Sequence, residues 1–260
     1  MKTILYTGAS SGIAKEVIKK LKNDYFIYVT VHNEKQLELV SKKYQKESNI
    51  KCLKLDITNY KDREQITNLD IDILINNAAI GYGGSISEIN MNKVRDNFEV
   101  NVFSSFEIVQ IVLKQMIKKE KGKIIIMGSL AALIPINFLG VYCATKASIQ
   151  KLTISLRNEL KIINSNIKII LIEPGLYHTG FNQVMLNNKY DFMEKKSYFE
   201  EELNFIRKKE NILFNLLEQK NFDSIVDKIV TAVNNPNPKV IYRAPFYQAI
   251  GSKIYQLFKG

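Results

Sequence analysis

The sequence predicts a doubly wound α/β fold, in which one parallel seven-stranded sheet lies between two layers of helices. Short β-branched runs alternate with longer segments of helical periodicity, which is typical of parallel strands joined by crossover helices. A chain of 260 residues with 46% hydrophobic residues can bury one substantial core. Because no Gly/Ser-rich linker or internal repeat divides the chain, we expect a single domain over residues 1–260.

Seven segments carry the strand pattern, and seven carry the helical pattern. The expected strands are residues 3–7, 26–31, 51–55, 71–75, 123–127, 167–172 and 240–242. The expected helices are residues 11–22, 34–46, 59–68, 88–98, 102–120, 142–162 and 223–234. Crossovers in such sheets are right-handed, and ligands bind beyond the carboxyl ends of the strands.

Residues 176–220 interrupt this alternation, because they are rich in charged and aromatic residues and contain no strand pattern. The segment follows the carboxyl end of the sixth strand, where binding residues gather. We therefore expect a helical lid over the substrate, with Tyr177, His178 and Phe181 at its start able to touch substrate. The alternative is a peripheral insertion without substrate contact.

The excess of 37 basic over 26 acidic residues gives a net charge of +11. The lysines come in twos and threes along expected helices without interleaved aromatic residues, so no nucleic-acid partner is expected. The first strand begins too early for an export signal, and Cys52 and Cys143 are expected to be reduced, which predicts a cytoplasmic location. Two histidines and two scattered cysteines have no ligand spacing, so no metal site is expected.

Residues 8–14 (GASSGIA) follow the first strand and open a helix. Small residues at this position let the backbone turn tightly and approach a pyrophosphate, and the helix N-terminus offers free N–H groups to that anion. The segment therefore predicts a dinucleotide phosphate site. The expected contacts are Gly8, Ser10, Ser11, Gly12 and Ile13.

Five motifs in chain order make the sequence resemble the short-chain dehydrogenase/reductase family. They are Thr7-Gly8-x-x-x-Gly12-x-Ala14, Asn76-Asn77-Ala78-Ala79, Ser129, Tyr142-x-x-x-Lys146 and Pro174-Gly175. The resemblance covers residues 3–180, with alanine at Ala14 and Ala79 where the family usually has glycine. It implies a Rossmann-like fold and a hydride transfer between NAD(P)(H) and a small-molecule carbonyl or secondary alcohol.

The second strand ends in Val31-His32-Asn33, without the carboxylate that would accept from ribose hydroxyls and repel a 2′-phosphate. With the partly basic His32 there, we expect NADP(H) to be preferred over NAD(H). The alternative is that His32 is only a surface residue. The motif positions imply further cofactor contacts at Asp56, Ile57, Asn77, Ala78, Pro174, Gly175 and Thr179.

Tyr142 and Lys146 are four residues apart and share one helix face. A nearby ammonium favours a phenolate, so Tyr142 is expected to exchange a proton with the reacting oxygen. Ser129 would hold that oxygen by a hydrogen bond, and no G-x-S-x-G turn supports a serine hydrolase instead. The resemblance implies that Lys146 also binds the nicotinamide ribose and that Asn101 holds a water linking Lys146 to solvent.

Phe246, Ile250, Ile254 and Phe258 form an apolar stripe at the C-terminus. We expect the stripe to pack on the chain's own core or on a partner subunit, with a membrane surface as the alternative. The resemblance implies a homodimer or homotetramer built on the helices of residues 102–120 and 142–162. A catalytically silent dinucleotide-binding sensor of the same fold is the alternative function, and the intact set Asn101, Ser129, Tyr142 and Lys146 favours the enzyme.

Overall fold

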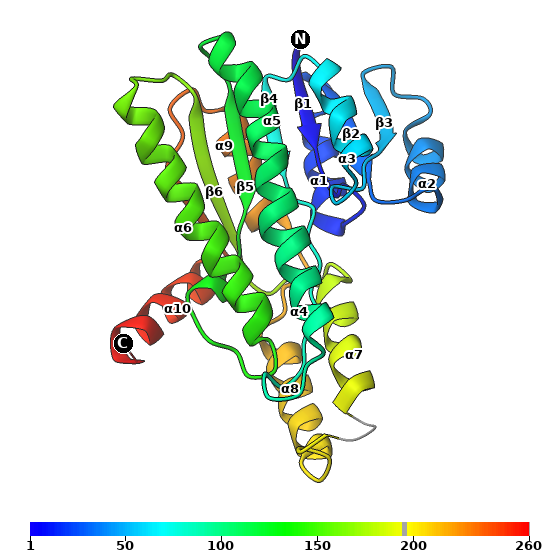
Figure 1. Cartoon of the computed structure of the whole chain (residues 1–260), viewed down its shortest axis with the longest axis vertical. Coiled ribbons are helices and arrows are strands. Elements are labelled where there is room, and N and C mark those ends of the chain that lie inside the picture. The colour runs from blue at the N-terminus through cyan, green and yellow to red at the C-terminus, as the bar shows by residue number, and fades with distance from the viewer. Residues whose placement is uncertain (194–196, 260) are drawn as a thin grey trace.

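The computed structural model describes residues 1–193 and 197–259; residues 194–196 of the expected lid and Gly260 of the expected domain lie outside the described residues. Seven parallel strands form one sheet in the order β3-β2-β1-β4-β5-β6-β7, with helices on both faces (Figure 1). The predicted fold class is confirmed. The order changes direction between β1 and β4, so the carboxyl ends of these strands open a crevice at the switch point.

The seven predicted strands are all present, with ends that differ from the prediction by two residues at most. They are β1 Lys2–Tyr6, β2 Tyr25–Val31, β3 Ile50–Lys54, β4 Ile73–Asn76, β5 Lys123–Met127, β6 Lys168–Pro174 and β7 Ile241–Ala244. The helices are α1 Gly12–Leu21, α2 Glu34–Tyr44, α3 Tyr60–Glu64, α4 Met91–Phe98, α5 Ser105–Lys118, α6 Gly140–Ile162, α7 Phe181–Met193, α8 Leu203–Leu217, α9 Asp223–Asn234 and α10 Phe246–Lys259.

Two apolar clusters hold the three layers together, one on each face of the sheet. Buried residues of α1, α2 and α9 form the first cluster, and buried residues of α5 and α6 contribute to the second. The central strands supply both clusters, because alternate side chains point to opposite faces; Ile4 belongs to one cluster and Leu5 to the other. Strands buried on both faces need continuous apolar runs, which explains the β-branched segments in the sequence.

The two helices expected over residues 88–98 and 102–120 form one continuous helical stretch, Met91–Lys118. A π-helical turn, Glu99–Ser104, joins α4 to α5. Within the described residues, this stretch alone is long and apolar enough to cross a membrane by length and composition, and 44% of its apolar window is buried inside the protein. Ile108 and Val112 lie in the apolar core, so the stretch is packed as a core helix.

The segment expected as a lid contains the helices α7 and α8, joined to the rest by turns, and both helices project beyond the carboxyl ends of the strands (Figure 1). Two contacts fix the segment. A β-bridge joins Tyr177 to Gln219, and a buried ion pair of 2.5 Å joins Lys189 of α7 to Glu210 of α8. The insertion is therefore tied to the end of β6 at its base and held together between its own helices.

The C-terminal stripe does not pack on the chain's own core, so that part of the expectation is wrong. Phe246 and Phe258 are 79% and 83% exposed. The helix turns small residues toward the protein instead, because Ala249 packs against Leu130 and Leu133 near the end of β5.

Candidate active site

A cleft of about 980 Å³ opens at the carboxyl ends of the strands. Most residues singled out from the sequence line it. They are Gly8, Ser10, Ser11, Ile13, His32, Asp56, Ile57, Asn77, Ala78, Ser129, Tyr142, Lys146, Pro174, Gly175 and Thr179. Gly12, Asn33 and Asn101 do not line the cleft. Gly12 faces Phe222, Asn33 caps α2, and Asn101 bonds the backbone of Ile80. The fold thus brings together motifs that are spread over 170 positions of the chain.

The turn after β1 is shaped to approach an anion. Gly8 has φ +61°, and a Cβ at this position would lie 2.6 Å from the Cα of Ala78, so the turn requires glycine. Ser11 caps α1 by accepting a hydrogen bond from the Ala14 N–H at 3.2 Å. Gly12 begins α1 with its Cα facing the Phe222 ring. The N-terminal N–H groups of α1 and the open turn fit a pyrophosphate.

A buried hydroxyl joins the ends of β1 and β4. The Thr7 Oγ1 donates to Asn76 Oδ1 at 3.2 Å and accepts from the N–H groups of Asn77 at 2.9 Å and Ala78 at 3.1 Å. The Asn77 amide donates to the carbonyls of Thr7 and Gly8 at 3.1 and 2.8 Å. Asn77 therefore holds the turn in place as well as lining the cleft.

Replacing Thr7 by Val should lower the free energy of unfolding by about 1–3 kcal/mol, because the N–H groups of Asn77 and Ala78 lose their acceptor. Thr153→Val in α6 is the matched control. Thr153 is equally buried, but its hydroxyl bonds only to the Ile149 carbonyl of its own helix, so the loss should stay below about 1 kcal/mol. Urea unfolding followed by circular dichroism measures both values; equal losses would contradict the proposed role of Thr7.

The adenosine end of the cleft is polar. His32 is 66% exposed, and its Nδ1 lies 3.7 Å from Asp56 Oδ1, which also accepts from the N–H and hydroxyl of Thr58. Gln36 also lines the cleft and accepts from the His32 N–H at 3.1 Å. No motif in the sequence indicates Gln36, although this residue lies one helical turn after His32. Asn33 caps α2 by accepting from the Gln36 N–H at 2.9 Å.

Ser129, Tyr142 and Lys146 meet at the centre of the cleft. Ser129 follows β5, where its hydroxyl accepts from the Ala131 N–H at 3.1 Å and donates to the Pro174 carbonyl at 3.5 Å. Tyr142 and Lys146 lie one turn apart on α6, with the Lys146 Nζ 5.7 Å from the Tyr142 ring centroid. The Lys146 ammonium donates to the Met127 carbonyl at 3.1 Å, which fixes it beside the end of β5.

Burial sets the protonation of this group. Burial raises the pKa of Tyr142 above the ordinary value of a phenol, although the neighbouring Ser129 side chain acts to lower that pKa. Burial also lowers the pKa of Lys146 to about 8. Desolvation is the largest cause, so the pKa of Tyr142 is raised and not lowered as its spacing from Lys146 predicts. At neutral pH the phenol holds its proton.

Asn101 braces the site from behind. The π-helical turn places this 1% exposed residue against the loop after β4, where its amide donates to the Ile80 carbonyl at 2.9 Å and accepts from the Ile80 N–H at 2.8 Å. The same amide donates to Thr145 Oγ1 at 3.1 Å, one residue before Lys146. Asn101 therefore links the cleft loop to α6. The sequence indicated the residue but not these three bonds.

The end of the cleft beyond Tyr142 is apolar. Phe181 of α7 lies there, with its ring centroid 5.8 Å from that of Tyr142. The remaining apolar side chains come from three segments: Ile134, Ile136, Leu139, Val184, Met185, Leu213, Phe214 and Leu217. Tyr177 also lines the cleft, whereas His178 binds Glu218 at 2.7 Å outside the wall. The predicted lid therefore supplies much of this wall.

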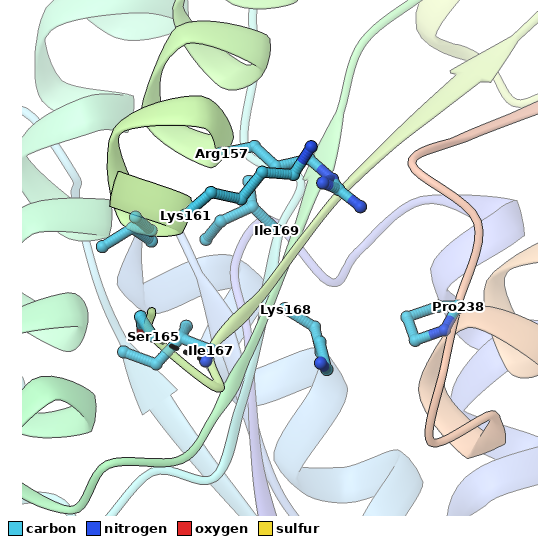
Figure 2. A pocket seen from close by; sticks show the side chains of 8 residues that line it. Arg157, Lys161, Ser165, Ile167, Lys168, Ile169 and Pro238 are labelled. Atoms are coloured by element: carbon cyan, nitrogen blue, oxygen red, sulfur yellow. Dashed lines mark hydrogen bonds between the residues drawn. The ribbon is translucent and has the colours of Figure 1, made fainter. Parts of the chain in front are cut away.

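A second, smaller cavity of about 150 Å³ lies at the opposite end of β6 (Figure 2). Arg157 and Lys161 of α6 extend toward it, and Lys168 at the start of β6 and Pro238 complete its rim. The residues singled out from the sequence lie at the other end of the strands. In residues 1–193 and 197–259, no three His, Cys, Asp or Glu side chains are grouped to hold a metal ion.

Comparisons with known proteins agree with this geometry. The family model described as short chain dehydrogenase matches residues 2–189. The NADP-dependent 3-hydroxy acid dehydrogenase of Schizosaccharomyces pombe is 32% identical over 93% of this chain and 96% of its own. Human 17-beta-hydroxysteroid dehydrogenase type 1 is 24% identical over 92% of this chain and 76% of its own. A short-chain dehydrogenase structure from Streptomyces avermitilis has 20% identity and a TM-score of 0.80 over 99% of this chain and 93% of its own.

The family match spans well over half of the chain, and the sheet order and the cleft follow the same pattern. The chain therefore belongs to the short-chain dehydrogenase/reductase family, whose members are oxidoreductases that act on CH–OH or C=O groups of small molecules with NAD(P).

Proposed function

We propose that this protein is an NADPH-dependent ketone reductase in which Tyr142 gives the proton to the carbonyl oxygen. The observation that carries the proposal is the meeting of Ser129, Tyr142 and Lys146 in the wall of one cleft, with Tyr142 and the buried Lys146 one turn apart on α6. One end of this cleft fits a dinucleotide, and the other end, which we call the apolar chamber, is lined largely by apolar side chains.

Bound NADPH supplies a hydride to the carbonyl carbon. The Ser129 hydroxyl donates a hydrogen bond to the carbonyl oxygen and holds it near Tyr142, whose proton passes to that oxygen. The Lys146 ammonium stabilises the phenolate that remains, and the ribose of the cofactor is expected to bind the same ammonium. The phenol is protonated at neutral pH, which is the form that a reduction needs.

The apolar chamber supports a moderately apolar ketone as substrate. Phe181, Met185 and Leu139 face the reacting group, and the polar groups at this end are few. The two relatives carry names that refer to a 3-hydroxy acid and to a 17-beta-hydroxysteroid, so their names do not select one substrate. A panel of ketones of increasing chain length, followed by NADPH absorbance, tests the proposal; no turnover of any ketone would contradict it.

The preference for NADPH rests on the end of β2. No carboxylate follows Val31, and the exposed His32 lines the cleft where a 2′-phosphate would lie. The Schizosaccharomyces pombe relative, named as NADP-dependent, agrees with this choice. Gln36 adds hydrogen-bonding groups at the same place.

Replacing His32 by Asp should lower the ratio of kcat/KM for NADPH over NADH by about tenfold or more, because a carboxylate repels the 2′-phosphate and accepts from ribose hydroxyls. Lys35→Asp is the control. This substitution also makes the charge near His32 more negative, but Lys35 is an exposed residue of α2 that does not line the cleft. Steady-state kinetics with both cofactors give the ratios. An unchanged ratio in the His32 variant would remove this residue from cofactor selection.

We also propose a single domain that assembles as a homodimer or homotetramer through α5 and α6 and works in the cytoplasm. Ile117 of α5 and Leu152 of α6 are 46% and 41% exposed, which leaves apolar surface for a second copy. The free thiols of Cys52 and Cys143 suit a reducing compartment. A molecular mass equal to that of one chain, measured by analytical ultracentrifugation, would contradict the proposed homodimer or homotetramer.

A further inference from the structure

The outer face of α10 is apolar, and it is not covered by any part of the chain that the structure describes. Phe246, Ile250, Ile254, Leu257 and Phe258 are 79%, 41%, 48%, 82% and 83% exposed, and we call these five residues the α10 face. At 3.6 residues per turn they fall within an arc of about 120°. The helix extends away from the sheet, with the C-terminus of the chain at its tip (Figure 1).

The inner side of α10 carries small residues, and this orientation of the helix leaves the α10 face exposed. Ala249 and Ser252 are each 7% exposed, and Ala249 packs against Leu130 and Leu133. The small residues thus meet the protein, while the bulky apolar residues face away from it. A helix that served only to close the core would bury its large side chains instead.

The α10 face lies beside the mouth of the cleft. Tyr247, Gln248, Gly251, Ser252 and Tyr255 of the same helix line the cleft. The helix is also joined to the last turn of α8, because the Tyr247 hydroxyl and the Gln248 amide donate to the Leu217 carbonyl at 3.0 and 2.7 Å.

Apolar exposure continues across this junction. Leu213 and Leu216 of α8 are 50% and 77% exposed, and Leu213 also lines the cleft. Apolar surface on two helices therefore borders the opening through which substrate enters.

The charges around this surface select one kind of partner. Residues 246–259 contain no Asp or Glu, and Lys253 lies exposed next to the α10 face. The whole chain carries a net charge of +11. Aromatic and aliphatic side chains flanked by lysines are the composition with which interfacial helices bind anionic lipid.

We propose that the α10 face docks on an anionic lipid surface and presents the cleft to carbonyl compounds dissolved in the bilayer. The second part rests on the proposed ketone reductase and narrows its substrate class to lipid-soluble ketones. A second copy of this chain on the same face would lie beside the cleft mouth and restrict entry, whereas a bilayer would supply an apolar substrate to the apolar chamber.

The test is co-sedimentation of the full chain with vesicles of phosphatidylcholine alone or with phosphatidylglycerol. Binding should be stronger on the anionic vesicles. Leu257→Ser with Phe258→Ser should weaken it by at least about tenfold, because the two most exposed side chains of the face no longer enter the lipid. Lys253→Gln should weaken binding about fivefold on anionic vesicles only.

The matched control is Leu39→Ser with Tyr60→Ser, which removes two apolar side chains that are 64% and 68% exposed on α2 and α3. Its vesicle binding should equal that of the unaltered protein. No binding by the unaltered protein, or equal loss in both double variants, would overturn the proposal. So would a dimer without vesicle affinity that dissociates in the Leu257/Phe258 variant.

Two further measurements separate this inference from the proposed function. Vesicle binding needs neither cofactor nor turnover, so Tyr142→Phe should bind vesicles like the unaltered protein. The Leu257/Phe258 variant should raise the KM for a long-chain ketone presented in vesicles and leave the KM for a water-soluble ketone unchanged. Equal changes in both KM values would overturn the delivery of substrate from lipid.

Discussion

Replacing Tyr142 by Phe should reduce kcat for ketone reduction about a thousandfold, because the proton donor is lost while the ring remains. The ring packs with Ala131, Leu139 and Met185, and Phe preserves those contacts. Affinity for NADPH should therefore change little. Steady-state kinetics give kcat, and a nicotinamide fluorescence titration gives the dissociation constant for the cofactor.

Tyr177→Phe is the matched control for this prediction. Tyr177 also lines the cleft and is 1% exposed, but its hydroxyl bonds Ser224 at 2.7 Å. Its loss should leave kcat within a few-fold of the original value. If Tyr142→Phe retained a tenth of the activity or more, another group would have to supply the proton.

Replacing Lys146 by Met should weaken NADPH binding and lower kcat, together reducing kcat/KM by about a hundredfold or more, because in the proposed mechanism one ammonium serves both the ribose and the phenolate. The pH dependence gives an independent readout. The pKa of Lys146 is about 8, so kcat/KM for reduction should be constant at lower pH and fall as this lysine loses its proton above pH 8. The Met variant should lack that decline.

The Lys146→Met variant should lose activity without losing thermal stability. The folded-state pKa of Lys146 lies below the unfolded value of 10.5, so the unfolded chain binds the proton more tightly. The buried Lys146 ammonium therefore lowers the free energy of unfolding below pH 8. This loss becomes smaller as the pH rises from about 8 to 10.5. Met removes the buried ammonium, and thermal unfolding at pH 7 should occur at the same temperature or higher.

Lys189→Met gives the contrasting result. Lys189 is fully buried but pairs with Glu210, so its removal takes the ammonium partner from a half-buried carboxylate between α7 and α8 and should lower the unfolding temperature. A Lys146→Met variant that unfolded as readily as Lys189→Met would mean that its lost activity reflects damage to the fold.

Much of the site could be predicted because its determinants are local. The glycine turn of residues 8–14 joins a strand to a helix, and the spacing of Tyr142 and Lys146 places both on one helix face. The carboxyl ends of parallel strands share one edge of the sheet, so residues that follow different strands meet there without further information. Ser129 and Pro174 reach the cleft in this way.

Other features depended on contacts between distant segments. Gln36 lies at the polar end of the cleft and accepts a hydrogen bond from the His32 N–H. Asn101 bonds Ile80 and Thr145 only because a π-helical turn orients it. No residue pattern in the sequence specified these partners. The outward face of α10 is a similar case, since periodicity reveals an apolar stripe but not which side of the helix meets the protein.

The sequence by itself determined the family, the sheet and the identity of the groups at the centre of the cleft, because these follow from chain order, periodicity and residue type. Only the tertiary structure decided their chemistry. Burial raises the pKa of Tyr142 and lowers that of Lys146, and the α8–α10 junction sets an apolar surface beside the cleft mouth. Solvent exclusion and surface exposure are properties of the whole packed chain, so local residue patterns do not contain them.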